Sequence, residues 1–503
     1  MAIGPARGAP PLGIPIVIAV LAGPAPDGRA DRAAFTRSHD AWRGESGPDL
    51  LVVEPDDPRA PSAGLRLDVA EAEASVAPGG LARAAAILLA SDASSVEPAG
   101  FWRGSPRTPE PYATVWEFEE VAARTPGPPS SLPSDSPAAP VALRRAEGGD
   151  GSRLSTEAWT VHSFAFRRGH ARPEVAALVP PGSARILEIG CGEGALGAVL
   201  ERAGARVTGV EPDAGAARVA ASRLSRVVPR GLDEAWDEIG EGWDAVVAAD
   251  VLEHFDDPLG ALRRLRERCR PGTALVTSLP NASHAAVLGG ALMGRWDLAL
   301  EGVVADDHRT WAGGPGWRRL LAACGWRVET ARPVTHVSRR LEPWVRALAE
   351  AGLPEAETSA IQWLFLARAD APEGSLELGR SNVAFAALVE DPVGAARAAA
   401  TASGEASWTL PNAVSGAALE ALFRGDVVLG EARAALSCGF TAAALARRFR
   451  GSGLAAAVTG LGRDALPPRV AHALEAADRA GLRTDAEAVS SSRLGLMVRV
   501  EAR

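Results

Sequence analysis

A glycine-rich turn between a predicted strand and a predicted helix is the feature that most limits how this chain can fold. The segment I-L-E-I-G-C-G-E-G-A-L-G, residues 186–197, starts as an apolar strand and continues through Gly190, Gly192 and Gly194 into a helical pattern. Glycine has no Cβ atom, so the backbone amides of such a turn can approach a ligand closely. The first amides of the following helix also favour an anionic group, which predicts a ligand site at the carboxyl end of the strand.

Strand-like and helix-like segments alternate after residue 184. Strands are predicted at 184–190, 206–211, 243–250 and 273–279, and a helix is predicted to follow Asp257. Strands that alternate with helices favour a parallel sheet covered on both faces. The sequence therefore predicts an α/β, Rossmann-like domain.

Two acidic residues flank the glycine turn at a spacing that suits one βαβ unit. Glu188 precedes the turn, and Glu211 follows 23 residues later (211 − 188), at the end of the next predicted strand. Glu188 can accept hydrogen bonds from a ligand's amino group, and Glu211 can accept them from both ribose hydroxyls. These groups suit S-adenosylmethionine (SAM), but G-C-G-E-G-A also fits a dinucleotide fingerprint. On this segment alone, an NAD-dependent oxidoreductase stays open as an alternative.

A second segment narrows the choice. The run W-D-A-V-V-A-A-D-V-L-E-H-F-D-D-P at 243–258 resembles the fourth strand and following loop of class I SAM-dependent methyltransferases. Ubiquinone-biosynthesis O-methyltransferases and the methyltransferases that accompany bacterial glycosyltransferases also carry runs like S-L-P-N-A-S-H at 278–284 and G-R-W-D at 294–297. They carry a D-x-x-H-x-R motif as well, which D-D-H-R at 306–309 matches with a shortened or shifted spacing. The resemblance implies a seven-stranded SAM methyltransferase core over residues 155–370.

The glycine turn and the resemblance together predict a set of cofactor-binding residues. Family members usually have Gly-Asp after the third strand, with the aspartate on the adenine amine, whereas this chain has Gly231 followed by Leu232 and Asp233. Either Asp233 or a backbone group is expected to take that role. The predicted cofactor-binding residues are Glu188, Gly190, Cys191, Gly192, Gly194, Glu211, Pro212, Asp233 and Asp250.

Catalytic candidates follow the fourth predicted strand. An oxygen acceptor must lose its proton, so a base or a metal ion should stand near the transferred methyl group. The predicted catalytic residues are His254, Asp250 and His308. In the quinone-type O-methyltransferases the positions matching Asp250, Glu253 and His254 are associated with a divalent cation, which makes these three a possible metal site. The alternative is that Glu253 and His254 only shape the loop while Asp250 contacts cofactor or substrate. His284 and Asn281 suit either helix capping or acceptor binding.

The remaining chain suggests further domains. Residues 1–125 are predicted to form an N-terminal α/β domain of unknown role, and the Pro/Ser-rich segment 126–154 a linker. Residues 371–503 are predicted to be a degenerate, partial methyltransferase-like repeat, because D-P, L-P-N-A and a glycine recur at offsets of 134 (391 − 257), 131 (410 − 279) and 128 (453 − 325). One hypothesis is that residues 1–125 supply the early strands that this repeat lacks.

The composition of the chain limits which classes of partner and metal site we expect. All 53 basic residues are Arg, and the net charge of −9 argues against nucleic acid, which is normally bound by a basic face. Four cysteines without paired spacing suggest neither a zinc ribbon nor a disulfide framework, and they fit a reducing cytoplasm. No segment is predicted to span a membrane. The leading hypothesis is O-methylation of a small-molecule or glycan-linked hydroxyl, and a SAM-binding scaffold without turnover is the non-enzymatic alternative.

Overall fold

The chain forms two compact units. One comprises residues 1–166, 446–455 and 499–503, and the other residues 167–445 and 456–498. Within the described part of the chain, no helix has both the length and the apolar character needed to cross a membrane. The structure, a computed structural model, describes residues 16–22, 50–53, 64–69, 74–76, 80–98, 101–103, 129–133, 141–156, 161–163, 171–296, 298, 302–305, 307–377, 392–429, 433, 436, 439–449 and 454–500.

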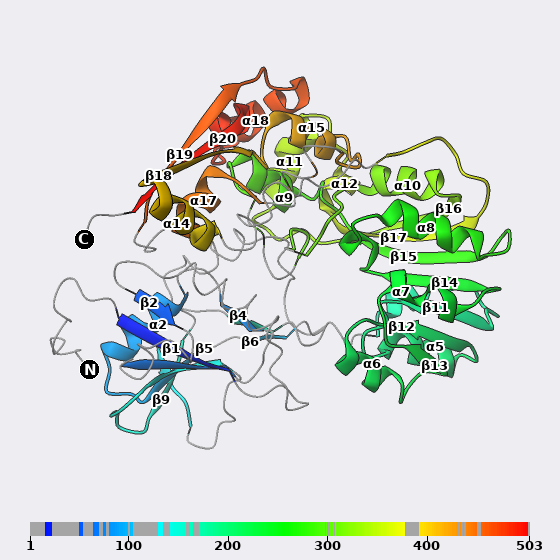
Figure 1. Cartoon of the computed structure of the whole chain (residues 1–503), viewed down its shortest axis with the longest axis horizontal. Helices are drawn as coiled ribbons and strands as arrows, with labels where there is room; N and C mark the ends of the chain where they lie inside the picture. Colours follow the sequence, from blue (N-terminus) through cyan, green and yellow to red (C-terminus); the bar gives the residue numbers. More distant parts are fainter. Residues whose placement is uncertain are drawn as a thin grey trace. The chain divides into compact units, whose positions relative to one another are not determined.

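A seven-stranded sheet forms the centre of the second unit (Figure 1). The first five strands of the sheet are parallel, and the sixth, β17, is antiparallel to both of its neighbours. The predicted Rossmann-like core is therefore confirmed. In sheet order the strands are β13 (Arg226–Val228), β12 (Arg206–Val210), β11 (Arg185–Ile189), β14 (Ala245–Ala249), β15 (Ala274–Pro280), β17 (Ala360–Ala369) and β16 (Trp326–Thr335).

The position of β17 separates this sheet from a dinucleotide-binding sheet. Dinucleotide-binding folds have the strand order 3-2-1-4-5-6. Here β17, the last strand of the domain in sequence, lies between β15 and β16. The topology thus favours the methyltransferase interpretation of the glycine turn over the NAD interpretation.

Apolar residues bury both faces of this sheet. Neighbouring residues of a strand point to opposite faces, so Ile186 packs in one apolar cluster and Leu187 in the other. The helices α4 (Pro173–Ala176), α5 (Ala195–Arg202) and α6 (Ala214–Ala220) cover the Ile186 face. The helices α7 (Leu232–Ile239), α8 (Pro258–Glu267) and α10 (Gly314–Ala323) cover the Leu187 face.

The helix predicted after Asp257 is confirmed as α8. The Asp257 side chain accepts a hydrogen bond of 2.9 Å from the Gly260 amide, and Pro258 occupies the first turn, where its missing N–H costs nothing. Leu259, Leu262 and Leu265 are buried against the sheet. Local sequence therefore sets both the start of this helix and the face that it buries.

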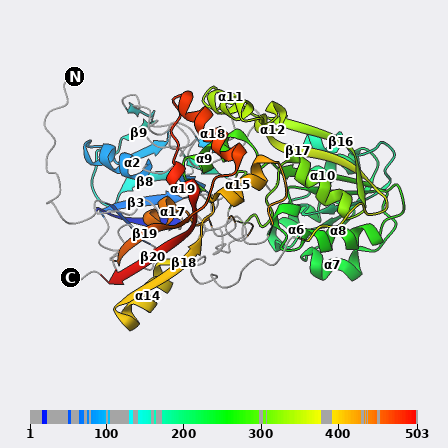
Figure 2. The same ribbon diagram turned by 90° about the horizontal axis from the view of Figure 1, so that it is seen from above.

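The second unit continues past β15 with helices α9 (Ala285–Leu292), α11 (Glu342–Glu350) and α12 (Glu355–Ser359). Most of the C-terminal region belongs to the same unit. It contains the three-stranded sheet β18-β20-β19, whose strand order corresponds to β15-β17-β16 (Figure 2). Its elements are α14 (Pro392–Ser403), β18 (Glu405–Pro411), α15 (Gly416–Phe423), α17 (Ala442–Phe449), β19 (Leu454–Arg463), α18 (Pro468–Arg479), α19 (Ala486–Ser490) and β20 (Ser491–Val500).

The N-terminal unit has its own sheet, in the order β2-β1-β3-β8-β5-β9-β7, with helix α2 (Gly80–Leu89), and a small sheet β4-β10-β6. Its strands are β1 (Ile16–Ala22), β2 (Leu50–Val53), β3 (Leu65–Val69), β4 (Ala74–Val76), β5 (Ser95–Pro98), β6 (Phe101–Arg103), β7 (Ser130–Ser131), β8 (Val141–Arg145), β9 (Arg153–Thr156) and β10 (Val161–Ser163).

The predicted linker at residues 126–154 is wrong over its second half. β8 lies inside the N-terminal sheet, between β3 and β5, and β9 also pairs with β5. The Pro-rich composition that suggested a linker ends at Pro140, and the alternating V-A-L-R-R that follows buries Ala142 and Leu143. Residues 126–128 and 134–140 lie outside the described residues.

The hypothesis that residues 1–125 complete the C-terminal repeat is also wrong for the described strands. The N-terminal strands and β18, β19 and β20 lie in different sheets. The N-terminal sheet contains β8, β9 and β7 from beyond residue 125 instead. Short apolar runs cannot specify their pairing partner, which is why the sequence left this choice open.

Two buried asparagines hold corresponding places after β15 and β18. The Asn281 side-chain amide donates to the carbonyl oxygens of Glu357 and Ala360, at 2.6 and 2.7 Å. The Asn412 amide donates to those of Ala488 and Ser491, at 2.9 and 2.6 Å. Each asparagine thus fastens the end of one strand to the start of the strand that pairs with it.

Replacing Asn412 should destabilise the C-terminal sheet. In Asn412→Ala, two carbonyl oxygens lose buried donors, at a cost of about 1–3 kcal/mol for each group left unsatisfied. Urea unfolding should therefore show a loss of about 2–4 kcal/mol. The exposed Glu475→Gln on α18 is the control. A loss below about 0.5 kcal/mol in Asn412→Ala would contradict this role.

Candidate active site

The glycine turn connects β11 to α5. Gly190, Gly192 and Gly194 have φ values of +65°, +52° and +75°, in the left-handed region that favours glycine. A Cβ atom on Gly190 would collide with Cγ2 of Val251, and one on Gly194 would lie 3.2 Å from Cα of Ala220. Conformation and space therefore both require glycine at these two positions.

Glu211 supports this turn from the end of β12. One carboxylate oxygen accepts a 2.8 Å hydrogen bond from the Gly192 amide, and the other accepts a 2.9 Å bond from the Asp213 amide. The residue is 9% exposed. Each carboxylate oxygen has a second lone pair, so Glu211 can hold the turn and still accept hydrogen bonds from two hydroxyls.

Glu188 is buried directly beneath the turn. Its Oε2 atom lies next to Gly197 of α5 and has no hydrogen-bond partner in the part of the chain that the structure describes. Burial raises the Glu188 pKa to about 8, and repulsion from Glu211 contributes in the same direction. A cationic donor at Oε2 would satisfy both its hydrogen bonding and its charge.

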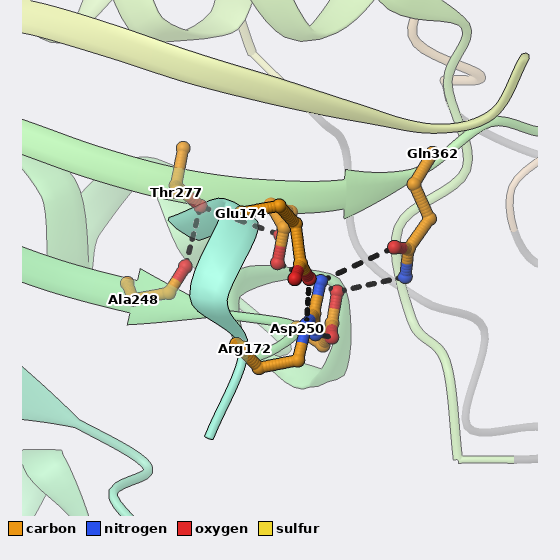
Figure 3. A network of polar contacts seen from close by, with 7 residues as sticks. Arg172, Glu174, Ala248, Asp250, Thr277 and Gln362 are labelled. Atoms are coloured by element: carbon orange, nitrogen blue, oxygen red, sulfur yellow. Dashed lines mark hydrogen bonds and ion pairs between the residues drawn. The ribbon is translucent and has the colours of Figure 1, made fainter. Parts of the chain in front are cut away.

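Asp250, at the end of β14, is the centre of a polar network (Figure 3). Its carboxylate forms an ion pair with Arg172, just before α4. It also accepts hydrogen bonds from the Ser278 hydroxyl on β15, at 2.8 Å, and from the Gln362 amide on β17, at 3.0 Å. Arg172 in turn contacts Glu174, at 2.5 Å. Asp250 thus joins three neighbouring strands to the segment that precedes α4.

The two ends of the central ion pair have unusual backbones. Arg172 and Asp250, at φ +42° and +53°, are the non-glycine residues of the described chain with positive φ. For such residues this conformation costs roughly 1–3 kcal/mol and persists only where surrounding contacts hold it. The network of Asp250 supplies those contacts.

A second cluster brings together Glu253, His254 and His308. One potential ligand atom from each lies within 4.8 Å of the other two. The imidazole rings meet edge to face at a centroid distance of 4.9 Å, and His254 Nδ1 lies 3.4 Å from Asp307 Oδ2. Glu253 and His254 belong to the short helix η3 (Leu252–His254). The cluster therefore joins the β14–α8 connection to the segment that precedes α10.

The predicted trio of Asp250, Glu253 and His254 does not assemble as one group. Asp250 is held by the Arg172 network, and His308 takes its place beside Glu253 and His254. The chain enters η3 directly after Asp250, and residues three and four positions apart need not share a face across a strand-to-helix transition. His308 lies 54 residues beyond His254 (308 − 254), a proximity that spacing could not reveal.

The other predicted cofactor residues are Cys191 in the turn, Pro212 after β12 and Asp233 in α7. Cys191 is buried, and burial raises the pKa of its thiol, so it packs rather than reacts. Pro212 is exposed next to Glu211, and Asp233 is exposed in the first turn of α7. Asp306 lies outside the described residues.

The structure gives Asn281 and His284 local roles. Asn281 Oδ1 accepts the Ser283 amide at 3.0 Å, besides the two carbonyl contacts above. His284 caps α9 by accepting the Ala286 amide at Nδ1, so its Nε2–H donates to the His336 carbonyl 2.8 Å away. Burial lowers the His284 pKa to about 4, which leaves the ring neutral. Both residues cap and brace the loop after β15.

Arg172 and Gln362 are the residues of this site that sequence reasoning missed. They lie 78 positions before and 112 positions after Asp250, within segments that carry no recognisable motif. The sole local signal is Pro173 after Arg172, which predicts a helix start but no ion pair.

Part of the chain is similar to proteins of a known family. Residues 163–331 match a family described as a methyltransferase domain. The ubiquinone biosynthesis O-methyltransferase of Ruegeria pomeroyi is 34% identical over 121 residues, which are 22% of this chain and 49% of the relative. That of Azorhizobium caulinodans is 34% identical over 136 residues, 25% of this chain and 54% of the relative. The chain thus spans about half the length of the curated relatives that it matches.

A SAM-dependent methyltransferase from Archaeoglobus fulgidus aligns with 41% of this chain and 97% of its own, at 17% identity and a TM-score of 0.31. The family match, the strand order of the sheet and the residues of the glycine turn together characterise this domain. The chain therefore carries a class I SAM-dependent methyltransferase domain.

Proposed function

We propose that the chain transfers the methyl group of SAM to a hydroxyl oxygen of a small-molecule or glycan-linked acceptor. The observation that carries the proposal is the pair of carboxylates at the glycine turn. Glu188 has a buried oxygen without a hydrogen-bond partner in the described residues, and both carboxylate oxygens of Glu211 act as hydrogen-bond acceptors. The likeness to two ubiquinone biosynthesis O-methyltransferases supports oxygen as the acceptor atom.

The residues present fit the cofactor. Its ammonium group would supply the donor and the positive charge that Glu188 Oε2 lacks, and its ribose hydroxyls would use the second lone pairs of Glu211. The glycines leave room for its carboxylate near the start of α5. When bound, the cofactor supplies a methyl group on a positively charged sulfur.

The protein's part in the reaction is to position and deprotonate the acceptor. The acceptor oxygen forms a bond to the methyl carbon while the carbon–sulfur bond breaks, and the hydroxyl proton must leave. His254 is half-buried beside Asp307 and His308, and an imidazole is well suited to accept a proton at neutral pH. The Asp250 network fixes the end of β14 on which this histidine depends.

A divalent cation at the same cluster is the alternative to a histidine base, because an imidazole nitrogen that holds a metal ion cannot also accept a proton. Glu253, His254 and His308 offer one oxygen and two nitrogens within 4.8 Å, a mixed set that suits zinc or manganese better than magnesium. An ion held there would lower the pKa of an acceptor hydroxyl. Asp250, the third ligand expected from sequence, would then contact the cofactor or the substrate instead.

Cofactor binding should depend on Glu211. Loss of two charge-assisted hydrogen bonds, each about 1.5 kcal/mol or more, should weaken binding of S-adenosylhomocysteine, the demethylated cofactor, at least about 100-fold in Glu211→Ala. Calorimetric titration measures this change. Glu241→Ala, at an exposed acidic residue, is the control. Unchanged affinity in Glu211→Ala would refute the cofactor assignment.

Binding should also release a proton from Glu188. Its raised pKa, about 8, leaves most of the carboxyl groups protonated at pH 7, and a cationic ligand favours the carboxylate. Affinity should therefore rise as pH increases toward 8. Calorimetry at pH 7 in two buffers of different ionisation enthalpy should give different heats for the wild type and equal heats for Glu188→Gln. Equal heats for the wild type would contradict the contact.

Turnover should depend on the histidine cluster. With phenolic, catecholic and glycan hydroxyl acceptors, mass spectrometry should detect one added methyl group. His254→Gln should lower kcat by roughly 10²–10⁴-fold without changing cofactor affinity, while the exposed His472→Gln should not. Loss of activity in chelator, restored by zinc or manganese, would support the cation. Cofactor binding without methylation of any acceptor would favour a scaffold role.

A further inference from the structure

The C-terminal region mirrors the last part of the methyltransferase sheet. The carbonyl partners of Asn281, on Glu357 and Ala360, correspond to those of Asn412, on Ala488 and Ser491, at a constant offset of 131 residues (412 − 281). The helices pair in the same way, because α9 packs on α15 and α11 packs on α18 (Figures 1 and 2). Elements at matching positions thus face one another.

The contacts between these two parts are reciprocal. Gly294, after α9, lies against Ala488 of α19, and Gly425, after α15, lies against Glu357 of α12. Both glycines have positive φ, +74° and +66°, and they are again 131 residues apart (425 − 294). Reciprocal contact between matching surfaces is the property of a two-fold interface between identical subunits. Here one chain supplies both sides.

The loops that follow the two glycines also meet. The Val428 amide donates to the Trp311 carbonyl at 2.9 Å, and the Trp296 indole donates to the Leu436 carbonyl at 3.0 Å. The first loop carries His308 of the catalytic cluster, and the second carries Arg433. The symmetry is therefore broken at the position where chemistry is expected.

Arg433 spans two segments of the candidate site. It is 3% exposed, and its Nε and Nη2 atoms donate to the carbonyl oxygens of Arg309 and Asp256, at 2.8 and 2.6 Å. The Arg309 and Thr310 amides donate to the Glu253 carbonyl, at 2.7 and 3.1 Å. Asp256 lies two residues after His254, and Arg309 follows His308. One edge of one guanidinium thus joins the two backbone segments that carry the cluster.

A buried cation is costly, so this arrangement needs a reason. Desolvation lowers the Arg433 pKa, and the charges of Asp256 and Asp257 offset part of that cost. A planar guanidinium presents two parallel N–H groups from one edge, a geometry that lysine cannot reproduce. The two N–H groups of the guanidinium fix the separation of the two carbonyls more tightly than an apolar side chain would.

From these contacts we infer that the C-terminal region, acting as an internal second subunit, completes the active site through Arg433. Arg433 is a positioning residue: it holds the Glu253–His254 turn and the His308 segment at the separation that the cluster requires. This inference rests on the proposed function for its catalytic consequence, but the geometry of the cluster can be tested without turnover.

The test uses the full chain labelled with ¹³C at the histidine Cε1 positions. NMR spectra of the wild type, Arg433→Met, Arg433→Lys and the exposed control Arg469→Met are compared at one pH, with the His254 and His308 signals assigned from His254→Gln and His308→Gln. Calorimetry gives the affinity for S-adenosylhomocysteine, and steady-state assays give kcat and KM for the acceptor.

Arg433→Met should move both histidine signals and lower kcat at least about tenfold while changing cofactor affinity less than twofold. The histidine signals and kcat of Arg433→Lys should lie between those of Arg433→Met and the wild type. The lysine variant replaces Arg433→Met in the test if the latter does not fold. Histidine signals and kcat matching those of Arg469→Met would overturn the inference, and so would a loss of cofactor affinity as large as the loss of kcat. If the wild type methylates no acceptor, the proposed function fails, and the histidine signals alone decide on Arg433.

Discussion

The hydrogen bond from the Gly192 amide to Glu211 is the contact on which the candidate cofactor site depends. It joins the turn after β11 to the end of β12, so it fixes the positions of two parallel strands and of the start of α5 relative to one another. Charge-assisted bonds of this kind are worth about 1.5–3 kcal/mol each, which offsets part of the backbone entropy lost when the glycine turn is ordered. Glu188 and Asp250 then lie at the same edge of the sheet, because parallel strands end together.

The fold of the central domain could be predicted from sequence because its signals are local. The glycine turn, the spacing of Glu188 and Glu211, and the Asp257–Pro258 helix start each act within one βαβ step. The proximity of His308 to His254, and of Arg172 and Gln362 to Asp250, depends on tertiary packing of distant segments. Composition gave a wrong prediction where a Pro-rich run adjoins the apolar strand β8, because the predicted linker included a strand of the N-terminal sheet.

The C-terminal region resembles the last part of the methyltransferase sheet in its strand order and in its buried asparagine. It has no counterpart of the glycine turn in the described residues, but it retains the asparagine anchor and the helices that face α9 and α11. The asparagine anchor joins the end of β18 to the start of β20, and these two strands are neighbours as β15 and β17 are. Arg433 donates to two backbone carbonyls, so these two hydrogen bonds do not depend on which side chains the two loops carry.

Under the proposed function, the buried oxygen of Glu188 has a consequence for the release of the product. Glu188 and Glu211 would hold an ammonium group and a ribose, which are common to the methyl donor and to the thioether left after transfer. Neither carboxylate would contact the methyl group or the sulfur, which are the parts of the ligand that change. Spent cofactor should therefore compete with fresh donor on nearly equal terms, so sustained turnover would require a separate reaction that destroys the thioether.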